Sequence, residues 1–254
     1  MGTVFSLTLR DVLRPGRLLV WLLVIVGICI TGFVWKRFTD GDAAILLGQY
    51  SGTLLMRFVA LAAAVFSGMV LSQEVEQKTI VYLLTRATPR WQLLLGRSLA
   101  AWVGAALVSV VAIVAGSVSL MGVSALGHAP MWRDALLVVI GAAAYTSLFV
   151  VVSLLVNRAM IWCLLFAFGW ETFVPNMPGD LTILSVQPYL KVFQIHPEPP
   201  AEASVIGFLA GQMNERVIPM GAAAFALAFI VIAGMGFGMA WFSQREYVPR
   251  EDGD

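Results

Sequence analysis

The chain has 254 residues, of which 59% are hydrophobic and only 12% are charged. A soluble domain carries about 25% charged residues, so this composition excludes an ordinary soluble fold. The net charge of +1 and the lack of a basic patch argue against a nucleic-acid partner. We therefore expect one all-α membrane domain over residues 1–254.

Six stretches approach or exceed the length needed to cross a membrane, which is about 20 apolar residues for a hydrocarbon core of about 30 Å. They are residues 18–35, 53–73, 92–122, 135–156, 159–174 and 217–243. The fifth stretch is the shortest. It follows the fourth after only Asn157 and Arg158, so these two helices must form a tight hairpin. The pattern predicts a bundle of six transmembrane helices.

Three shorter helices are expected outside these spans. Residues 4–14 form an amphipathic pattern before the first span, which predicts an interfacial helix at the amino terminus. Residues 74–86 predict a separate helix in the connection after the second span, with Glu76 on its apolar side. The proline-rich connection over residues 175–216 contains an apolar stretch at 203–213, which predicts a short helix at the outer leaflet.

Lysine and arginine are distributed unevenly between the two sides of the predicted bundle. The side with both termini carries ten cations and seven acidic residues, a net charge of +3, and the other side carries six and eight, a net charge of −2. Loops on the cytoplasmic side of a membrane carry an excess of lysine and arginine. Both termini are therefore predicted to be cytoplasmic.

Two charged residues fall within the predicted spans. Arg57 lies 16 residues from Gln73 and Glu171 lies 13 residues from Arg158, which puts them about 24 and 20 Å above the cytoplasmic ends of their helices. Charges inside spans are functional candidates that need a partner. We predict that Arg57 and Glu171 pair, or line one polar patch of a substrate pathway. Alternatively, Arg57 extends to the outer headgroups and Glu171 caps the short fifth helix.

Small residues recur at a spacing that lets membrane helices approach closely. Gly96, Ala100 and Gly104 form one such row in the third span, and Gly234 and Gly238 form another in the sixth. These rows predict close packing within one bundle or, alternatively, a seam between two copies of the chain.

Residue types that carry catalysis or bind metals are sparse. Cys29 and Cys163 both lie in apolar stretches and behave as small buried hydrophobic residues. His128 and His196 fall in outside connections without a second ligand at short spacing, so no metal site is expected. The chain also contains no Gly-x-Ser-x-Gly or His-Glu-x-x-His motif, and we predict no catalytic residues.

The most informative segment is the connection between the second and third spans. It contains Glu-x-Glu-x-x-Thr-Ile-x-Tyr-Leu-Leu-Thr, followed by Pro-Arg and by a Gly-Arg that opens the third span. Its charge pattern alone is typical of an ordinary solvated loop helix. The full motif resembles the corresponding loop of ABC transporter permeases of the second, export-associated type. The number of spans and the loop lengths are similar over nearly the whole chain.

The resemblance implies that this segment is a coupling helix, which docks into a groove of an ATPase subunit. The residues implied as contacts are Glu74, Glu76, Lys78, Thr79, Tyr82 and Arg86. The chain has no Gly-Lys dipeptide and therefore no phosphate-binding P-loop, so a separate nucleotide-binding subunit would use ATP and Mg²⁺. The resemblance also implies a homodimer or close heterodimer of permeases in the cytoplasmic membrane of a bacterium or archaeon.

Three classes of function follow from these features. The expected one is the membrane-spanning subunit of an ATP-driven exporter, whose apolar pathway suits a lipid, a drug or another amphipathic substrate. An alternative keeps the ATPase partner but transmits its motion to an extracytoplasmic protein without moving a substrate. A membrane-embedded enzyme is a third class, disfavoured by the lack of a catalytic cluster.

Overall fold

The computed structural model describes residues 2–12, 15–38, 42–76, 89–156, 158–176, 180–196 and 218–244. Within these ranges the chain forms helices and turns and contains no strand. Five helices are long and apolar enough to cross a membrane, so the protein belongs to the multi-pass class of membrane proteins. The helix predicted at residues 203–213 lies outside the described residues.

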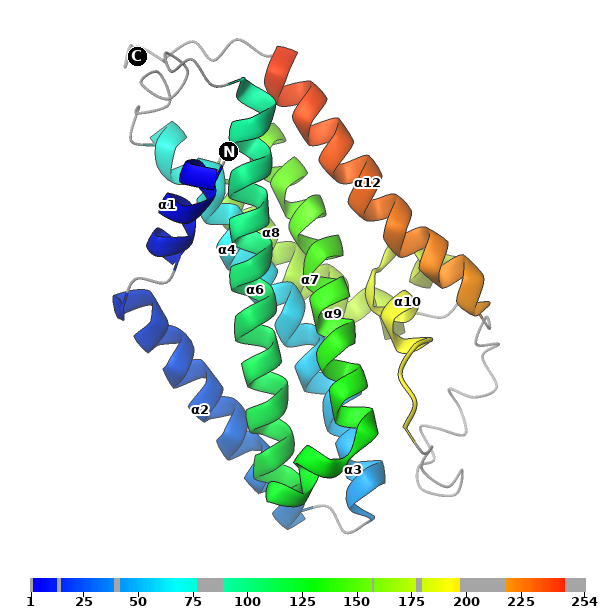
Figure 1. Ribbon diagram of the computed structural model, residues 1–254. Coiled ribbons are helices and arrows are strands. Elements are labelled where there is room, and N and C mark those ends of the chain that lie inside the picture. Colours follow the sequence, from blue (N-terminus) through cyan, green and yellow to red (C-terminus); the bar gives the residue numbers. More distant parts are fainter. Residues whose placement is uncertain are drawn as a thin grey trace.

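The first 76 residues of the chain run along the bundle twice. Helix α1 (Gly2–Val12) packs against α6 at one end of the bundle, which we call the α1 end, and α2 (Pro15–Phe38) runs to the opposite end (Figure 1). The chain returns through α3 (Ala43–Tyr50), a π-helical segment (Ser51–Leu55) and α4 (Met56–Glu76), which follow one another without a break. These three elements form one long helix.

A long helical hairpin follows. It consists of α6 (Arg90–Met121), a 3-10 turn at Val123–Gly127 and α7 (Ala129–Leu155). The last helix, α12 (Met220–Gln244), packs mainly against α7 and ends at the α1 end of the bundle (Figure 1).

The core of the bundle lies between α4, α6 and α7. In the most apolar stretches of the second, third and fourth candidate spans, 56–61% of the residues are buried, against 11% in both α2 and α12. Helices that remain apolar on their exposed faces are typical of membrane spans. The two peripheral helices therefore present the surfaces expected to face lipid.

Five of the eight tryptophans lie near the two ends of the bundle. Trp91, Trp162 and Trp241 lie near the ends of α6, α8 and α12 that meet at the α1 end, and Trp35 and Trp132 lie near the opposite end. Tryptophan is enriched at the two interfaces between membrane and water. This distribution supports an orientation with the helices crossing the bilayer.

Helix α2 contacts the bundle near both of its ends. Near its start, the Trp21 ring stacks on Phe66 of α4 with ring centroids 5.1 Å apart. Near its end, a Cβ added at Gly32 would collide with the Ser119 hydroxyl of α6. The Tyr50 hydroxyl donates to the Ile28 carbonyl at the same level. Glycine at position 32 is thus required for the close approach of α2 and α6.

Two glycines of α12, Gly234 and Gly238, face α7. A Cβ at Gly234 would lie 3.2 Å from Ser147, and one at Gly238 would lie 3.5 Å from Leu154. The Ser147 hydroxyl also donates to the Ile230 carbonyl at 3.2 Å. Gly234 and Gly238 therefore pack within one bundle, as the first of the two alternatives predicted, and in the third span Gly96, Ala100 and Gly104 are buried.

Three predicted boundaries are wrong. The second helix begins at Ala43 and not at residue 53, because polar Ser51 is buried against α7 and does not belong to a loop. The fourth begins at Ala129, which brings Asp134 into the helix. Helix α4 continues through Glu76, so a separate helix does not begin at Glu74. The rest of that predicted helix lies outside the described residues.

The predicted fifth span is a short helix in which a π-helical segment interrupts the α-helical hydrogen bonding, and we call it the broken helix. It comprises α8 (Ala159–Leu165), a π-helical segment (Phe166–Trp170) and α9 (Glu171–Phe173), after a tight turn at Arg158 with a left-handed φ of 59°. These 15 residues extend only about 22 Å, less than a membrane core. Among the described residues, five of the six predicted spans correspond to helices long enough to cross a membrane, so the predicted count of six is not confirmed.

The chain after α9 is buried in part, mainly at residues 185–187, 189 and 190. It forms 3-10 turns at Val174–Asn176 and Asp180–Leu184 and then α10 (Gln187–Lys191). A Cβ added at Gly141 of α7 would lie 2.8 Å from the Leu190 side chain, so α10 packs on the middle of α7. Irregular backbone at such a level needs partners for its polar groups.

Candidate functional site: a buried polar network at the broken helix

Two buried carboxylates anchor the segment from Ser185 to His196, which we call the strap. Asp134 and Glu171 are each only 1% exposed, and both accept hydrogen bonds from strap residues. Polar groups buried in a low-dielectric bundle are costly unless they are paired. The strap supplies donors for both carboxylates, so these residues form one connected site.

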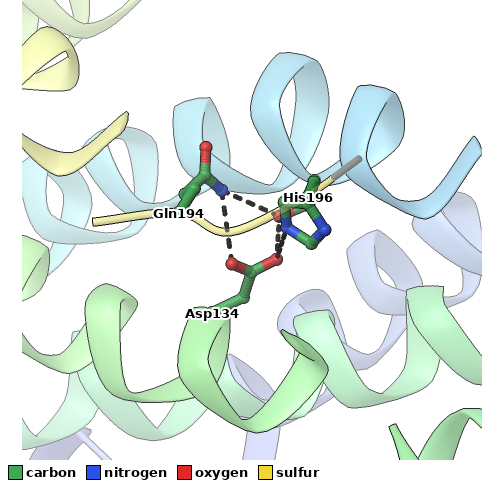
Figure 2. Close-up of polar contacts among 4 residues, drawn as sticks. Asp134, Gln194 and His196 are labelled. Carbon is green, nitrogen blue, oxygen red and sulfur yellow. Dashed lines mark hydrogen bonds and ion pairs between the residues drawn. The ribbon is translucent and has the colours of Figure 1, made fainter. Parts of the chain in front are cut away.

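Asp134 is the centre of the first cluster, near the start of α7. Figure 2 shows Gln194 and His196 of the strap directed toward its carboxylate. His196 Nε2 lies 2.9 Å from Asp134 Oδ2, and the Ser51 hydroxyl donates to the same oxygen. Gln194 Nε2 lies 3.1 Å from Ser51 Oγ and 3.4 Å from Asp134 Oδ1. Three side chains from two elements, the first π-helical segment and the strap, thus converge on one carboxylate.

Glu171 is the centre of the second cluster, near the middle of α7. The Tyr145 hydroxyl of α7 donates to Glu171 Oε2 at 2.9 Å, and the Ser185 hydroxyl donates to the same oxygen at 2.7 Å. The Val186 amide donates to Oε1 at 3.1 Å. Three donors compensate the desolvation of this carboxylate, two of them from the strap.

Gln187 links the two clusters. Its backbone N–H donates to Ser185 Oγ at 3.3 Å, and its side-chain Nε2 donates to the Gly52 carbonyl at 3.1 Å. Gly52 is adjacent to Ser51, the partner of Asp134. The polar contacts therefore continue from the middle of α7 to its start, along the whole strap.

Both clusters lie at π-helical segments. Ser51 and Gly52 are the first two residues of one segment, and Glu171 directly follows the other. A π-helical turn in an α-helix is rare, often occurs at functional sites, and disrupts the regular backbone ladder. Here it coincides with the two places where the strap binds, which is why we regard the network as the candidate functional site.

The chemistry of the Asp134 cluster does not match a hydrolase. A serine nucleophile needs a histidine between itself and the carboxylate. Here Asp134 lies between Ser51 and His196 and binds both. Among the described residues there is also no group of three His, Cys, Asp or Glu side chains arranged to hold a metal ion. The arrangement is suited to holding the strap against α3 and α7.

The predicted pair Arg57 and Glu171 is not brought together as an ion pair within the described residues. Glu171 accepts its hydrogen bonds from Tyr145, Ser185 and Val186. Arg57 lies two residues after the first π-helical segment, and its buried Nε has no hydrogen-bond partner in the described part of the chain. A role for either residue in a substrate pathway stays a prediction.

The predicted coupling residues fall at the edge of the described chain. Glu74 and Glu76 belong to the last turns of α4. Lys78, Thr79, Tyr82 and Arg86 lie outside the described residues. Their proposed contacts with an ATPase therefore stay a prediction.

Sequence analysis missed Asp134, Ser51 and the polar residues of the strap. His196 was noted only as an isolated histidine in an outside connection. A signal for Asp134 was present, because Pro130 occupies the first turn of α7 and a proline there marks a helix start before Asp134. No comparable signal identifies the long-range contacts of Ser51 or Gln194.

Replacing Asp134 by asparagine is expected to lower the free energy of unfolding by about 1–2 kcal/mol, because Ser51 and His196 lose a charged acceptor. The matched control is Asp42→Asn. Asp42 is exposed and its side chain makes no capping hydrogen bond, so the change should stay within about 0.5 kcal/mol. Thermal unfolding of the purified protein in detergent measures both. Equal shifts would contradict a structural role for the Asp134 cluster.

Comparison of the chain with protein-family models and with curated proteins yields no match.

Proposed function

We propose that the protein is the membrane-spanning subunit of an ATP-driven exporter of the ABC class. One observation carries the proposal: the connection between α4 and α6 contains the Glu-x-Glu-x-x-Thr-Ile-x-Tyr-Leu-Leu-Thr motif, followed by Pro89 and Arg90. This motif resembles the ATPase-docking loop of export-associated permeases. The five long apolar helices are compatible with such a subunit.

The arrangement of the helices supports the same proposal. The last turns of α4 and the first turn of α6, which flank the motif, lie at the α1 end of the bundle, where α12 also ends (Figure 1). In our proposal this end faces the cytoplasm, as the excess of lysine and arginine predicts. The strap would then occupy the outer half of the protein.

In the proposed mechanism, a separate subunit binds and hydrolyses ATP with Mg²⁺, and a second permease copy completes the transporter. ATP binding would stabilise one of two arrangements of the helices, and release of the products would favour the other. The substrate would be a lipid, a drug or another amphipathic molecule, because the interior of the bundle consists mainly of apolar side chains. Arg57 and Glu171 are the charged residues proposed for the pathway.

The first test asks whether a reading frame adjacent to that of the chain encodes a Walker A ATPase, and the full chain is then reconstituted with that ATPase. The wild-type permease is expected to bind the ATPase and raise its activity. A combined Glu76→Ala and Thr79→Ala variant is expected to weaken both effects about tenfold, the equivalent of roughly 1.4 kcal/mol of docking free energy. Arg37→Ala is the control, because Arg37 lies at the opposite end, in the last turn of α2.

Unchanged binding and ATPase activity in the double variant would overturn the coupling assignment. Export is separated from force transmission by a second measurement, in sealed vesicles loaded with a fluorescent phospholipid. ATP-dependent movement of the lipid supports export. ATPase stimulation without movement of lipid or amphipathic dyes favours the alternative in which the motion acts on an extracytoplasmic protein.

A further inference from the structure

We infer that the strap and the first π-helical segment form one conformational switch: the strap docks on α3 and α7 only while Ser51–Leu55 is π-helical, and its release returns these residues to an α-helix. The inference concerns a movement within the chain and goes beyond the proposed function. It rests on three sets of contacts.

The first set joins the strap to the start of the π-helical segment. Gln187 Nε2 donates to the Gly52 carbonyl at 3.1 Å, and Gln194 Nε2 donates to Ser51 Oγ at 3.1 Å. Hydrogen bonds in an α-helix run from residue i+4 to residue i, and in a π-helix from i+5 to i. One extra residue is therefore accommodated in this turn. The strap contacts are made at the place where the extra residue changes the backbone.

The second set shows that the π-helical turn also fixes how α3 is rotated about its own axis relative to α4. One turn before it, the His196 ring lies so close to Gly48 that a Cβ added there would be 2.6 Å from His196 Cβ. Adding or removing one residue in a helix rotates the residues on one side by about 100° relative to the other. A change in this turn therefore moves Gly48 relative to the strap.

The third set indicates that docking is incomplete. Gln187 Oε1 and His196 Nδ1 are buried and have no hydrogen-bond partner within the described residues. A buried polar atom without a partner costs free energy that water recovers once the atom is exposed. The docked strap thus combines favourable hydrogen bonds with two uncompensated atoms, and π-helical geometry is itself rare. Both features reduce the free energy needed for release.

The test uses one thiol as a reporter of strap release. Val186→Cys is introduced into the full chain after Cys29→Ala and Cys163→Ala, and labelling by a water-soluble maleimide is measured in detergent. The Val186 side chain is buried, and its hydrogen bond to Glu171 comes from the backbone, so the reporter leaves the polar network intact. The labelling rate then reports how often the strap leaves the bundle.

Deletion of Leu54 removes the extra residue from the π-helical turn. Leu54 is exposed, and Leu54→Ala is the matched control because it removes the same side chain without changing the length of the turn. We expect labelling of the Val186→Cys thiol to be about tenfold faster after the deletion, because this is the effect of leaving one buried donor unpaired. In Leu54→Ala the labelling rate should be unchanged. Equal labelling rates in the deletion variant and its parent would overturn the inference.

A second variant keeps the test decisive if the deletion prevents folding. Gln187→Leu retains the full length and removes only the contact to the Gly52 carbonyl. The switch predicts faster labelling together with slower amide hydrogen exchange at residues 55–57, because an α-helical turn replaces the π-helical one. Faster labelling without slower exchange, or no faster labelling, would show that the strap and the turn move independently.

Discussion

Replacing Glu171 by alanine is expected to lower the free energy of unfolding by about 3–5 kcal/mol, because buried donors are then left without an acceptor. The affected groups are the hydroxyls of Tyr145 and Ser185 and the amide of Val186. They lie at the centre of the bundle, where water cannot replace the carboxylate. The loss is larger than for a surface acid because Glu171 holds the broken helix, the strap and α7 together.

The chain supplies its own probe for this measurement. The Cys163 thiol is fully buried in α8, one π-helical segment away from Glu171, and its reaction with a fluorogenic maleimide during heating reports local unfolding. Cys29→Ala removes the other thiol. Tyr145→Phe is the matched control, since it deletes one of the three donors and is expected to cost about 1 kcal/mol. Equal effects of the two variants would contradict a shared acceptor at Glu171.

Replacing Gly32 by leucine is expected to lower the free energy of unfolding by about 3 kcal/mol and to separate α2 from α6. Two effects add: overpacking costs about 1–3 kcal/mol, and the hydrogen bond of Tyr50 to Ile28 is lost as the helices part. The β carbon of any side chain at position 32 would already collide with the Ser119 hydroxyl. The Gly116 carbonyl, 3.3 Å from that position, is backbone and cannot rotate away.

Gly27→Leu provides a control in the same helix. A Cβ at Gly27 meets nothing within 4 Å, so leucine there should be tolerated and even improve helix formation. The two variants are compared by thermal unfolding in detergent, with the reaction of Cys163 with the maleimide as the readout. If Gly27→Leu destabilised the protein as much as Gly32→Leu, the effect would arise from leucine in α2 generally and not from the crossing with α6.

The long apolar helices were predictable because hydrophobic length is a local property of the sequence. The third and sixth spans were placed within three residues of α6 and α12 at both ends. The start of the second helix was missed because Gln49, Ser51 and Gly52 are typical of a loop. Their helical structure depends on Asp134 and Gln187, which are distant in sequence.

The polar network was predictable only in part. Glu171 was identified as a buried acid that needs a partner, and the structure shows it buried with three donors. Its partners were not identified, because a hydroxyl or a backbone amide carries no charge pattern that a sequence reveals. The strap itself was treated as an outside connection, since its prolines and polar residues are typical of loops and its position in the bundle arises from tertiary contacts.

The tight turn at Arg158 has a consequence for biosynthesis. The segment Ala159–Phe173 is apolar except at a few positions, of which Glu171 is charged. At 15 residues it is too short to enter a bilayer efficiently alone. Because α7 precedes them directly, we expect the translocon to receive α7 and α8 as one helical hairpin. The strap can reach its place only after this hairpin has entered the lipid, which makes the Glu171 cluster a late product of insertion.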